Sequence, residues 1–354
     1  MEHHSWTISD AFIDIPAETW HGKEPELLTD LKSQLSKSPW LQGLVDTLEE
    51  WINSSSMRCQ TSGSTGTPKL FSFSKKQIQR SAERTLSHLN IPPNSWLYCP
   101  IPLAFIGGKM MLFRALLGGH HLRVVQPHLK PSHFEQPKFA FASFTPSMWN
   151  EVVATFPHKN CAILLGGGPV SASLEKTSTP FNQVYNSYGM TETLSHVALR
   201  KLNHDTHFIP LEGVLLSTEL GGNLSIEDGD IQVSTNDLVS FTDLGHFMVL
   251  GRQDFIINSG GIKINPELWE KELGFPCCIS WLTSAQFGQE LVLVVDPEKA
   301  PSWKEKLDKT TQKRLIKKVL ISAQFPKTSS GKIDRNKLQH MLVEYQDSII
   351  HLEK

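Results

Sequence analysis

The sequence contains few cysteines, and their spacing suggests neither a metal site nor a disulfide framework. Five cysteines are scattered over 354 residues, and no two have the C-x-x-C spacing of a zinc site or a redox motif. An odd, scattered set is typical of a reducing compartment, where thiols stay free and are usually buried. We therefore expect a cytoplasmic protein that needs neither disulfides nor a structural metal.

The sequence also lacks an excess of charge of one sign and a long uninterrupted apolar run. Its 34 Lys and Arg residues nearly balance 36 Asp and Glu residues, which argues against binding nucleic acid or anionic membranes through bulk charge. The longest apolar stretch, residues 100–119, is interrupted by Lys109 and Arg114, so we expect no membrane span. The first residues lack the basic and apolar regions of a secretory signal.

The pattern of apolar residues predicts two domains of unequal size. Between residues 70 and 188, short strand-like runs alternate with helical patterns, which indicates a large α/β domain with a mostly parallel sheet. Residues 196–250 form short alternating segments separated by Gly and Asp turns, as in an antiparallel β subdomain. We place the large domain at 1–253 and a smaller α+β domain at 254–354. The smaller domain is expected to contain strands near 278–283 and 291–295 and helices near 303–314 and 335–352.

The first candidate binding site is the segment TSGSTGTPK at residues 61–69. Glycines allow the backbone to approach a polyanion, hydroxyl and N–H groups donate to phosphate oxygens, and Lys69 adds a positive charge. It is not a Walker A loop, because only two residues separate Gly63 from Gly66 and a proline precedes the lysine. A surface linker rich in Ser and Gly is the alternative interpretation.

Three later segments carry groups that suit a nucleotide and its metal ion. In YNSYGMTET at 185–193, an aromatic ring, a hydroxyl and a carboxylate follow one another within five residues. The sequence GRQD at 251–254 precedes the glycine pair 260–261, and PKTSSGKIDR at 326–335 places two lysines in a loop rich in Ser and Gly. Taken alone, each has an ordinary explanation, such as a core aromatic, a turn in a linker, or a solvated lysine.

Together and in this order, these segments resemble the motifs of the adenylate-forming superfamily, which includes acyl- and aryl-CoA ligases, luciferases and adenylation domains. The resemblance covers residues 58–340 and implies a large AMP-binding domain followed by a small mobile domain. It implies that a carboxylic acid reacts with ATP and Mg²⁺ to give an acyl-adenylate, and that coenzyme A then displaces AMP. Between the two steps, rotation about Asp254 would exchange Lys332 for the loop at Gly260 and Gly261.

The resemblance assigns roles to individual residues of this sequence. Lys332, Thr191 and Glu192 are the implied catalytic residues, and Glu192 would also hold Mg²⁺. Asp254 is the implied hinge. The implied nucleotide- and coenzyme A-binding residues are Thr61, Ser62, Gly63, Ser64, Thr65, Gly66, Thr67, Lys69, Gly167, Gly168, Pro169, Ser187, Tyr188, Gly189, Met190, Asp237, Arg252, Gly260 and Gly261.

Two aspartates compete for the role of accepting hydrogen bonds from the ribose hydroxyls. Asp243 lies in the sequence Thr-Asp-Leu-Gly, which looks closer to the family's T-G-D-x-G motif. Asp237, however, precedes Arg252 by fifteen residues, which is the family's spacing, although Asn236 replaces the usual glycine. We therefore assign the ribose to Asp237 and expect Asp243 in a hairpin turn.

The position of the phosphate loop and two further segments narrow the resemblance. The loop begins nearer the start of the chain than in most relatives, and residues 106–111 and 257–264 resemble the compact o-succinylbenzoate–CoA ligases of menaquinone biosynthesis. The implied acid is then an aromatic keto-diacid. We propose Lys109 as the partner of its ring carboxylate, because a basic residue in an apolar segment needs a partner or the surface. The candidates for the acyl pocket are Phe105, Lys109, Ser143, Leu194 and His196.

Other functions remain open at this point. The chain could be another acyl- or aryl-CoA ligase, or an adenylation domain that loads a carrier protein. A nucleotide-binding protein without catalysis is the alternative from a different class, and the presence of Lys332, Glu192 and Asp237 argues against it. The expected partners are small molecules, without nucleic acid or a membrane span, and the sequence leaves a homo-oligomer open.

Overall fold

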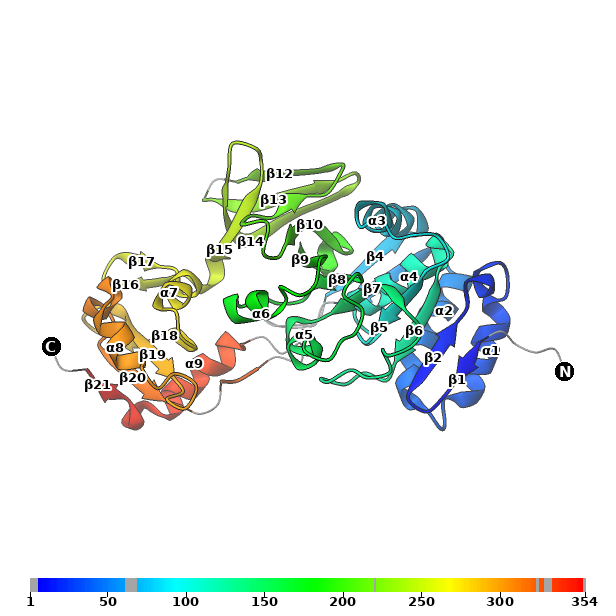
Figure 1. Cartoon of the computed structure of the whole chain (residues 1–354). Helices are drawn as coiled ribbons and strands as arrows, with labels where there is room; N and C mark the ends of the chain where they lie inside the picture. Colours follow the sequence, from blue (N-terminus) through cyan, green and yellow to red (C-terminus); the bar gives the residue numbers. More distant parts are fainter. Residues whose placement is uncertain (1–5, 61–68, 220, 323–324, 328–332, 353–354) are drawn as a thin grey trace. The chain divides into compact units, whose positions relative to one another are not determined.

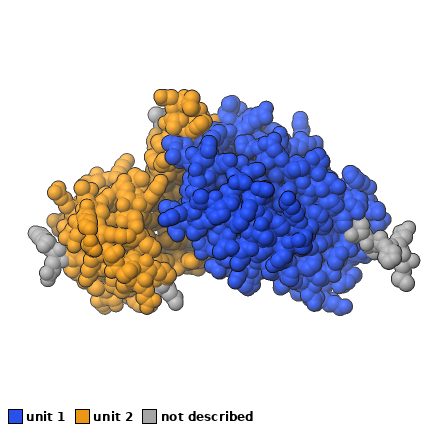
Figure 2. All heavy atoms as spheres, in the orientation of Figure 1, with its two compact units in different colours: residues 1–215, 227–233 blue, residues 216–226, 234–354 orange. Residues whose placement is uncertain are grey.

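The computed structural model of the chain describes residues 6–60, 69–219, 221–322, 325–327 and 333–352. Its contacts divide the chain into two compact units (Figure 2). Unit 1 contains residues 1–215 and 227–233, and unit 2 contains residues 216–226 and 234–354. Contacts therefore group most of the β subdomain with the C-terminal part of the chain. The expected boundary at 253/254 separates the large domain from the residues that would rotate about Asp254. Contacts do not test such a rotation, so this boundary stays a prediction.

The central element of unit 1 is a nine-stranded sheet in the order β1-β2-β6-β5-β7-β8-β9-β10-β11 (Figure 1). Strands β6, β5, β7, β8 and β9 are parallel neighbours, whereas the strands at both edges pair antiparallel. The mostly parallel sheet expected from the sequence is thus confirmed. The strands are β1 (Thr7–Ile8), β2 (Phe12–Ile15), β5 (Trp96–Cys99), β6 (His121–Val125), β7 (Phe139–Phe144), β8 (Ala162–Leu165), β9 (Val184–Gly189), β10 (His196–Lys201) and β11 (Ile209–Pro210).

Three helices of unit 1, α3, α5 and α6, begin at residues whose side chains cap them. Ser74 accepts a hydrogen bond from the N–H of Gln77, and the Gln77 side chain accepts from the Ser74 N–H, which closes a capping box at the start of α3. Thr145 and Ser171 cap α5 and α6 through their hydroxyls, which accept from the N–H groups of Met148 and Leu174. The helices are α1 (Glu24–Gln34), α2 (Gln42–Asn53), α3 (Lys75–His88), α4 (Ile106–Gly118), α5 (Pro146–Val152) and α6 (Ala172–Thr177), and a separate hairpin consists of β3 (Ser56–Gln60) and β4 (Leu70–Ser74).

An aromatic cluster forms the core beside the parallel strands. Trp149 packs edge-to-face against Phe156 and Phe181, and Tyr98 packs against Phe139 and other rings of the same cluster. Strand β8 is buried on both faces of the sheet, and all four of its residues are apolar. This rigid core fixes the carboxyl ends of β8 and β9, from which the candidate site is built.

Two further sheets follow in the sequence. The first begins at the end of unit 1 and lies mostly in unit 2, and the second lies wholly in unit 2. The strands β12 (Val214–Thr218), β13 (Asn223–Asp228), β14 (Ile231–Phe241) and β15 (Phe247–Arg252) form the β subdomain. The expected start at residue 196 was wrong, because β10 and β11 pair with the nine-stranded sheet of unit 1 instead. The other sheet follows the order β17-β16-β19-β20-β21, and β18 pairs with β19. Its elements are β16 (Ile257–Ser259), β17 (Ile262–Ile264), α7 (Pro266–Leu273), β18 (Cys277–Ser284), β19 (Gly288–Val295), α8 (Trp303–Asp308), β20 (Lys318–Ile321), α9 (Arg335–Glu344) and β21 (Ile350–His351).

Two helices of unit 2 are shorter than the sequence pattern predicts. Helix α8 ends at Asp308, and a separate 3-10 turn covers Thr311–Arg314 after Thr310, a β-branched residue with extended backbone. Helix α9 ends at Glu344 instead of continuing to 352, because Ile350 and His351 pair with β20. Among the described residues, no helix is long and apolar enough to cross a membrane.

The five cysteines are buried and free, and we expect them to be unreactive in the folded protein. Burial raises the pKa of Cys59 to about 11, that of Cys99 and Cys277 to about 12, and those of Cys161 and Cys278 in the same direction. Since the thiolate is the reactive form, a raised pKa leaves less thiolate at pH 8 than in the unfolded chain. With a chromogenic disulfide reagent, no thiol should react within minutes before unfolding, and five should react in guanidinium chloride. One rapidly reacting thiol in native buffer would contradict this expectation.

Candidate functional site

The carboxyl ends of β8 and β9 bring two predicted nucleotide-binding segments together in unit 1. The strands are parallel neighbours, so the glycine turn after Leu165 lies beside Ser187, whose hydroxyl donates to the Leu165 carbonyl at 2.9 Å. Gly167 has a φ of 83°, a conformation that favours glycine. Ligands of open α/β sheets commonly bind at the carboxyl ends of strands. One end of the sheet, where β8 and β9 finish, therefore carries seven of the predicted residues: Gly167, Gly168, Pro169, Ser187, Tyr188, Gly189 and Met190.

The turn after β9 presents the two predicted catalytic side chains of this segment. Gly189 lies so close to β10 that a Cβ atom there would overlap the Ser195 carbonyl oxygen. The Thr193 hydroxyl accepts from the Met190 N–H at 3.0 Å and donates to the Ser195 carbonyl at 2.7 Å, which closes the turn. Thr191 and Glu192 remain half-buried at its tip. The turn therefore leaves a hydroxyl and a carboxylate accessible at the edge of the sheet.

The Glu192 carboxylate fits the way in which enzymes hold Mg²⁺ at a nucleotide. Among the described residues, no group of three or more His, Cys, Asp or Glu side chains could form a metal cage. Mg²⁺ usually needs no such cage, because one or two carboxylates and substrate phosphates hold it while it keeps several waters. Glu192 supplies one accessible carboxylate beside the predicted nucleotide-binding segments, which fits that arrangement.

A buried arginine on α4 is a candidate site residue that the sequence interpretation did not name. Arg114 is 2% exposed, and its Nη2 atom donates to the Ser195 hydroxyl at 3.0 Å. Its Nε atom is buried without a hydrogen-bond partner. Burial lowers the pKa of Arg114 to about 9, so the guanidinium is still charged at neutral pH. Within the part of the chain that the structure describes, no carboxylate forms an ion pair with it.

Polar groups surround this arginine. The imidazole of His196 lies 3.3 Å from the Ser195 hydroxyl and 3.2 Å from the Thr85 hydroxyl. Burial, and then the charge of Arg114, holds the pKa of His196 well below its usual range, so the ring is neutral. The Ser143 hydroxyl donates to the sulfur of Met111, which also accepts from Arg114. This polar cluster can therefore offer one positive charge and several uncharged hydrogen-bonding groups.

The predicted acyl-pocket residues do not all lie with this cluster. Ser143 and His196 share its contacts, and Leu194 is buried directly before Ser195, with a φ of 64°. Lys109 instead donates from Nζ to the Arg58 carbonyl at 2.9 Å, and Phe105 is 37% exposed. The role of Lys109 toward a carboxylate stays a prediction, but the structure provides Arg114 as a second basic candidate.

Asp237 and Arg252 face each other in unit 2. They are paired across β14 and β15, with 3.6 Å between Arg252 Nη1 and Asp237 Oδ1. The same guanidinium binds both oxygens of Asp254, at 2.9 and 3.0 Å. Asp243 lies in the turn between these strands, where the Thr242 carbonyl accepts from the Gly245 N–H. The pairing provides a carboxylate and a guanidinium at the same end of the hairpin, while Asp243 is a turn residue as expected.

For the remaining predicted residues, the structure gives a backbone position or does not describe them. Gly260 and Gly261 form the turn between β16 and β17 with positive φ values of 59° and 87°, and the Gly260 N–H donates to the Phe287 carbonyl. Lys69 directly precedes β4. Thr61, Ser62, Gly63, Ser64, Thr65, Gly66, Thr67 and Lys332 lie outside the described residues.

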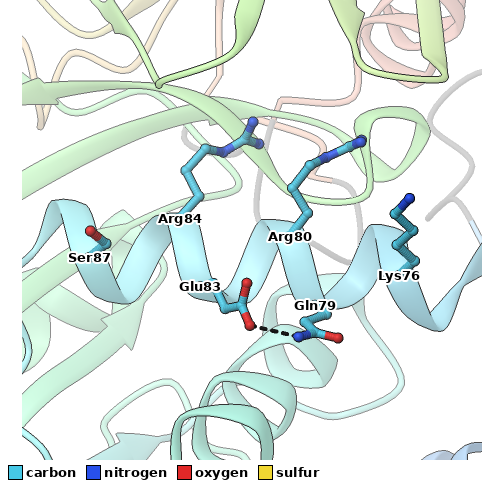
Figure 3. Close-up of a pocket in the computed structure, with 6 residues that line it drawn as sticks. All are labelled: Lys76, Gln79, Arg80, Glu83, Arg84 and Ser87. Atoms are coloured by element: carbon cyan, nitrogen blue, oxygen red, sulfur yellow. Dashed lines mark hydrogen bonds between the residues drawn. The ribbon is translucent and has the colours of Figure 1, made fainter.

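An open pocket on the surface of unit 1 contains none of the predicted site residues. It is lined by one face of α3, through Lys76, Gln79, Arg80, Glu83, Arg84 and Ser87 (Figure 3). Arg84 binds both oxygens of Asp228, at 2.9 and 2.8 Å, and Arg80 donates to the Asp228 carbonyl. Both arginines thereby bind α3 to the turn between β13 and β14, which belongs to the same unit, and these contacts are structural.

Comparisons with known proteins show which family and which solved structures this chain is similar to. A family model described as "AMP-binding enzyme" matches residues 24–219. A 2-succinylbenzoate–CoA ligase from Listeria monocytogenes is 26% identical, and the match covers 82% of this chain and 71% of that protein. The enzyme of the same name from Staphylococcus aureus is 25% identical, and this chain spans 65% of its length. The o-succinylbenzoate CoA synthetase of Bacillus subtilis, in complex with its acyl-adenylate intermediate, shares the fold with a TM-score of 0.67, at 20% identity over 79% of this chain and 68% of that chain.

Proposed function

The chain belongs to the AMP-binding enzyme family, and we propose that it is an ATP-dependent ligase that converts a carboxylic acid into its coenzyme A thioester. The finer proposal is that the acid has two carboxylates, with o-succinylbenzoate as the first candidate. The observation that supports the finer proposal, a dicarboxylic acid, is the buried Arg114. The relatives that bear that name support the choice of acid.

Arg114 favours a dicarboxylic acid because a buried cation without a counter-ion is costly. Removing an ion from water costs several kcal/mol unless an opposite charge and hydrogen bonds compensate. Here the described residues provide hydroxyls and a neutral imidazole, but no carboxylate. One carboxylate of the substrate would supply the missing charge, while the other would react with ATP.

The first step joins two anions, so the chain must supply positive charge. The substrate carboxylate oxygen attacks the α-phosphorus of ATP, a P–O bond forms, and pyrophosphate leaves with the electron pair of the broken bond. Lys69, Arg252 and Lys332 are the cations proposed to stabilise the oxygens that gain charge. Asp237 would accept hydrogen bonds from the ribose hydroxyls. Mg²⁺, held by Glu192 and phosphate oxygens, would supply further neutralisation of charge.

The second step requires no nucleophile from the protein. The thiolate of coenzyme A attacks the acyl carbonyl carbon, a C–S bond forms, and AMP leaves with the electrons of the C–O bond. The raised pKa values of all five cysteines agree with this, because none would be an effective nucleophile at neutral pH. We propose that Gly260 and Gly261 contact coenzyme A in this step, after rotation about Asp254.

A panel of carboxylic acids with ATP, Mg²⁺ and coenzyme A tests the proposal. We expect o-succinylbenzoate to give pyrophosphate and a thioester, and monocarboxylic analogues to have kcat/KM values lower by about 100-fold, the scale for losing one partner of a buried charge pair. Pyrophosphate without thioester would instead indicate an adenylation domain that loads a carrier protein. No pyrophosphate with any acid would indicate a nucleotide-binding protein without catalysis.

A further inference from the structure

The hinge segment places one aromatic ring between two arginines that belong to different elements of unit 2. Phe255 ends the 3-10 turn Gln253–Phe255 that follows β15, and it is half-buried. The guanidinium carbon of Arg252 lies 5.6 Å from its ring centroid, and that of Arg335 lies 5.3 Å from it. Both distances allow a cation–π interaction. The ring therefore contacts the end of β15 and the start of α9 at once.

Carboxylates on both sides make it feasible for two cations to share this ring. Arg252 binds Asp254 and faces Asp237, whereas Arg335 binds both oxygens of Glu270, at 2.7 and 3.1 Å. Without these acids, the two guanidinium groups would repel each other at the ring. The ring thus connects two ion-pair clusters, one of which contains the arginine proposed to contact the nucleotide.

Glu267 provides a second connection between the same elements. Its carboxylate accepts from the backbone N–H of Arg252 at 2.9 Å, and it lies 3.9 Å from the guanidinium of Arg335. Burial raises the pKa of Glu267, and the nearby arginines partly oppose this shift. The nucleotide-side arginine and the start of α9 are therefore connected twice, through a ring and through a carboxylate.

Arg335 holds the start of α9 in place. It donates to the Ile279 carbonyl of β18, and Glu270 accepts from the Ile279 N–H, so the ion pair is tied to the sheet from both sides. Just before it, Asp334 caps α9 by accepting from the Lys337 N–H. The Asp334 N–H also donates to the Pro326 carbonyl, and Lys327 bridges to Ile333. These contacts fix both described ends of the segment in which the proposed catalytic Lys332 lies.

We propose that Phe255, together with Arg335 and Glu270, is a positioning element of the ligase that couples Arg252 to the start of α9. Its effect is on the adenylation step, because that step uses both Arg252 and the lysine three residues before Arg335. The inference rests on the proposed function. It adds to the hinge role of Asp254 a role for the neighbouring Phe255 ring, which contacts both Arg252 and Arg335.

Phe255→Leu is the direct test, since leucine keeps an apolar side chain but loses the ring face. Adenylation is measured as pyrophosphate release from ATP and the acid, and thiolation as thioester formation from supplied acyl-adenylate and coenzyme A. We expect the adenylation kcat to fall about tenfold, because two cation–π contacts are lost together. Thiolation should change by less than about twofold. Phe255→Tyr should restore adenylation, because tyrosine keeps the ring face.

Tyr345→Leu is the matched control, because it also removes a half-exposed ring from unit 2, and no cation–π contact among the described residues uses that ring. It should leave both partial reactions at the wild-type rate. In addition, Phe255→Leu should add little to Arg335→Lys, since residues that act through one another are not additive. Thermal unfolding of each variant shows whether it is folded.

The possible outcomes separate this inference from the proposed function. If wild type releases no pyrophosphate with any acid, the proposed function fails and this inference fails with it. An active wild type with an equally active Phe255→Leu variant would overturn the inference alone. Equal losses in both partial reactions, with no recovery in Phe255→Tyr, would also overturn it, because a purely structural role predicts that result.

Discussion

Replacement of Lys332 by alanine should abolish adenylate formation, with a loss on the order of 10³-fold or more, while thiolation of a supplied acyl-adenylate should stay close to the wild-type rate. Positively charged groups that stabilise a transferring phosphoryl group have effects of this size. The second step needs no cation at the phosphate, because AMP is the leaving group and the acyl carbon is attacked. Pyrophosphate release and thioester formation should be measured separately, with purified acyl-adenylate as substrate for the second step.

Lys327→Ala is the matched control for this experiment. Lys327 is an exposed lysine near the other end of the same segment, and its bridge to Ile333 is formed by the backbone, so alanine preserves it. We expect adenylation in this variant to remain near the wild-type rate. Equal losses in both half-reactions of Lys332→Ala would refute the idea that the lysine serves the first step alone.

Replacement of Arg114 by methionine should lower activity toward the dicarboxylic acid without lowering the stability of the fold. We expect kcat/KM for the dicarboxylic acid to fall on the order of 10²- to 10³-fold, since the substrate would lose the partner of a buried charge. Monocarboxylic acids should lose far less. The free energy of unfolding without ligand should stay equal or rise by about 1–4 kcal/mol, because an apolar side chain replaces a buried cation that has no counter-ion among the described residues. Steady-state kinetics and denaturant unfolding give both quantities.

Arg123→Met provides the contrast, because this arginine is buried but paired. Its Nε and Nη2 atoms bind the two oxygens of Asp14, at 2.6 and 2.5 Å. The same substitution here should lower the free energy of unfolding by about 3 kcal/mol, since it leaves the half-buried Asp14 carboxylate without its partner. A comparable loss of stability in Arg114→Met would show that Arg114 supports the fold and would argue against its role in binding the acid.

Much of the fold could be predicted because its signals are local. The run Ala162–Leu165 is apolar on both faces, and that pattern identified a buried strand. Ser74 marked the start of α3, because its side chain can satisfy a free N–H in the first turn. The long helix expected near residue 352 was wrong, because pairing of Ile350 with β20 depends on residues far away in the sequence.

The candidate site was only partly predictable for a related reason. Both Lys109 and Arg114 interrupt the same apolar helix, and the sequence does not say which of them faces the core. In the structure, Lys109 reaches a backbone carbonyl at the surface, whereas Arg114 is enclosed beside Ser195. That difference depends on how α4 packs against α3 and β5 and on its contact with Ser195, and no periodicity within the helix encodes it.

The sequence by itself therefore determined the family and the residues that its motifs contribute, because backbone approach to phosphate, capping and strand patterning require particular residue types at short spacing. The tertiary structure decided which charges meet. Among the described residues it left Arg114 buried without a carboxylate, and it placed Phe255 between Arg252 and Arg335, which are far apart in the sequence. Charge pairing and ring contacts depend on distances in space, so only the folded chain could reveal them.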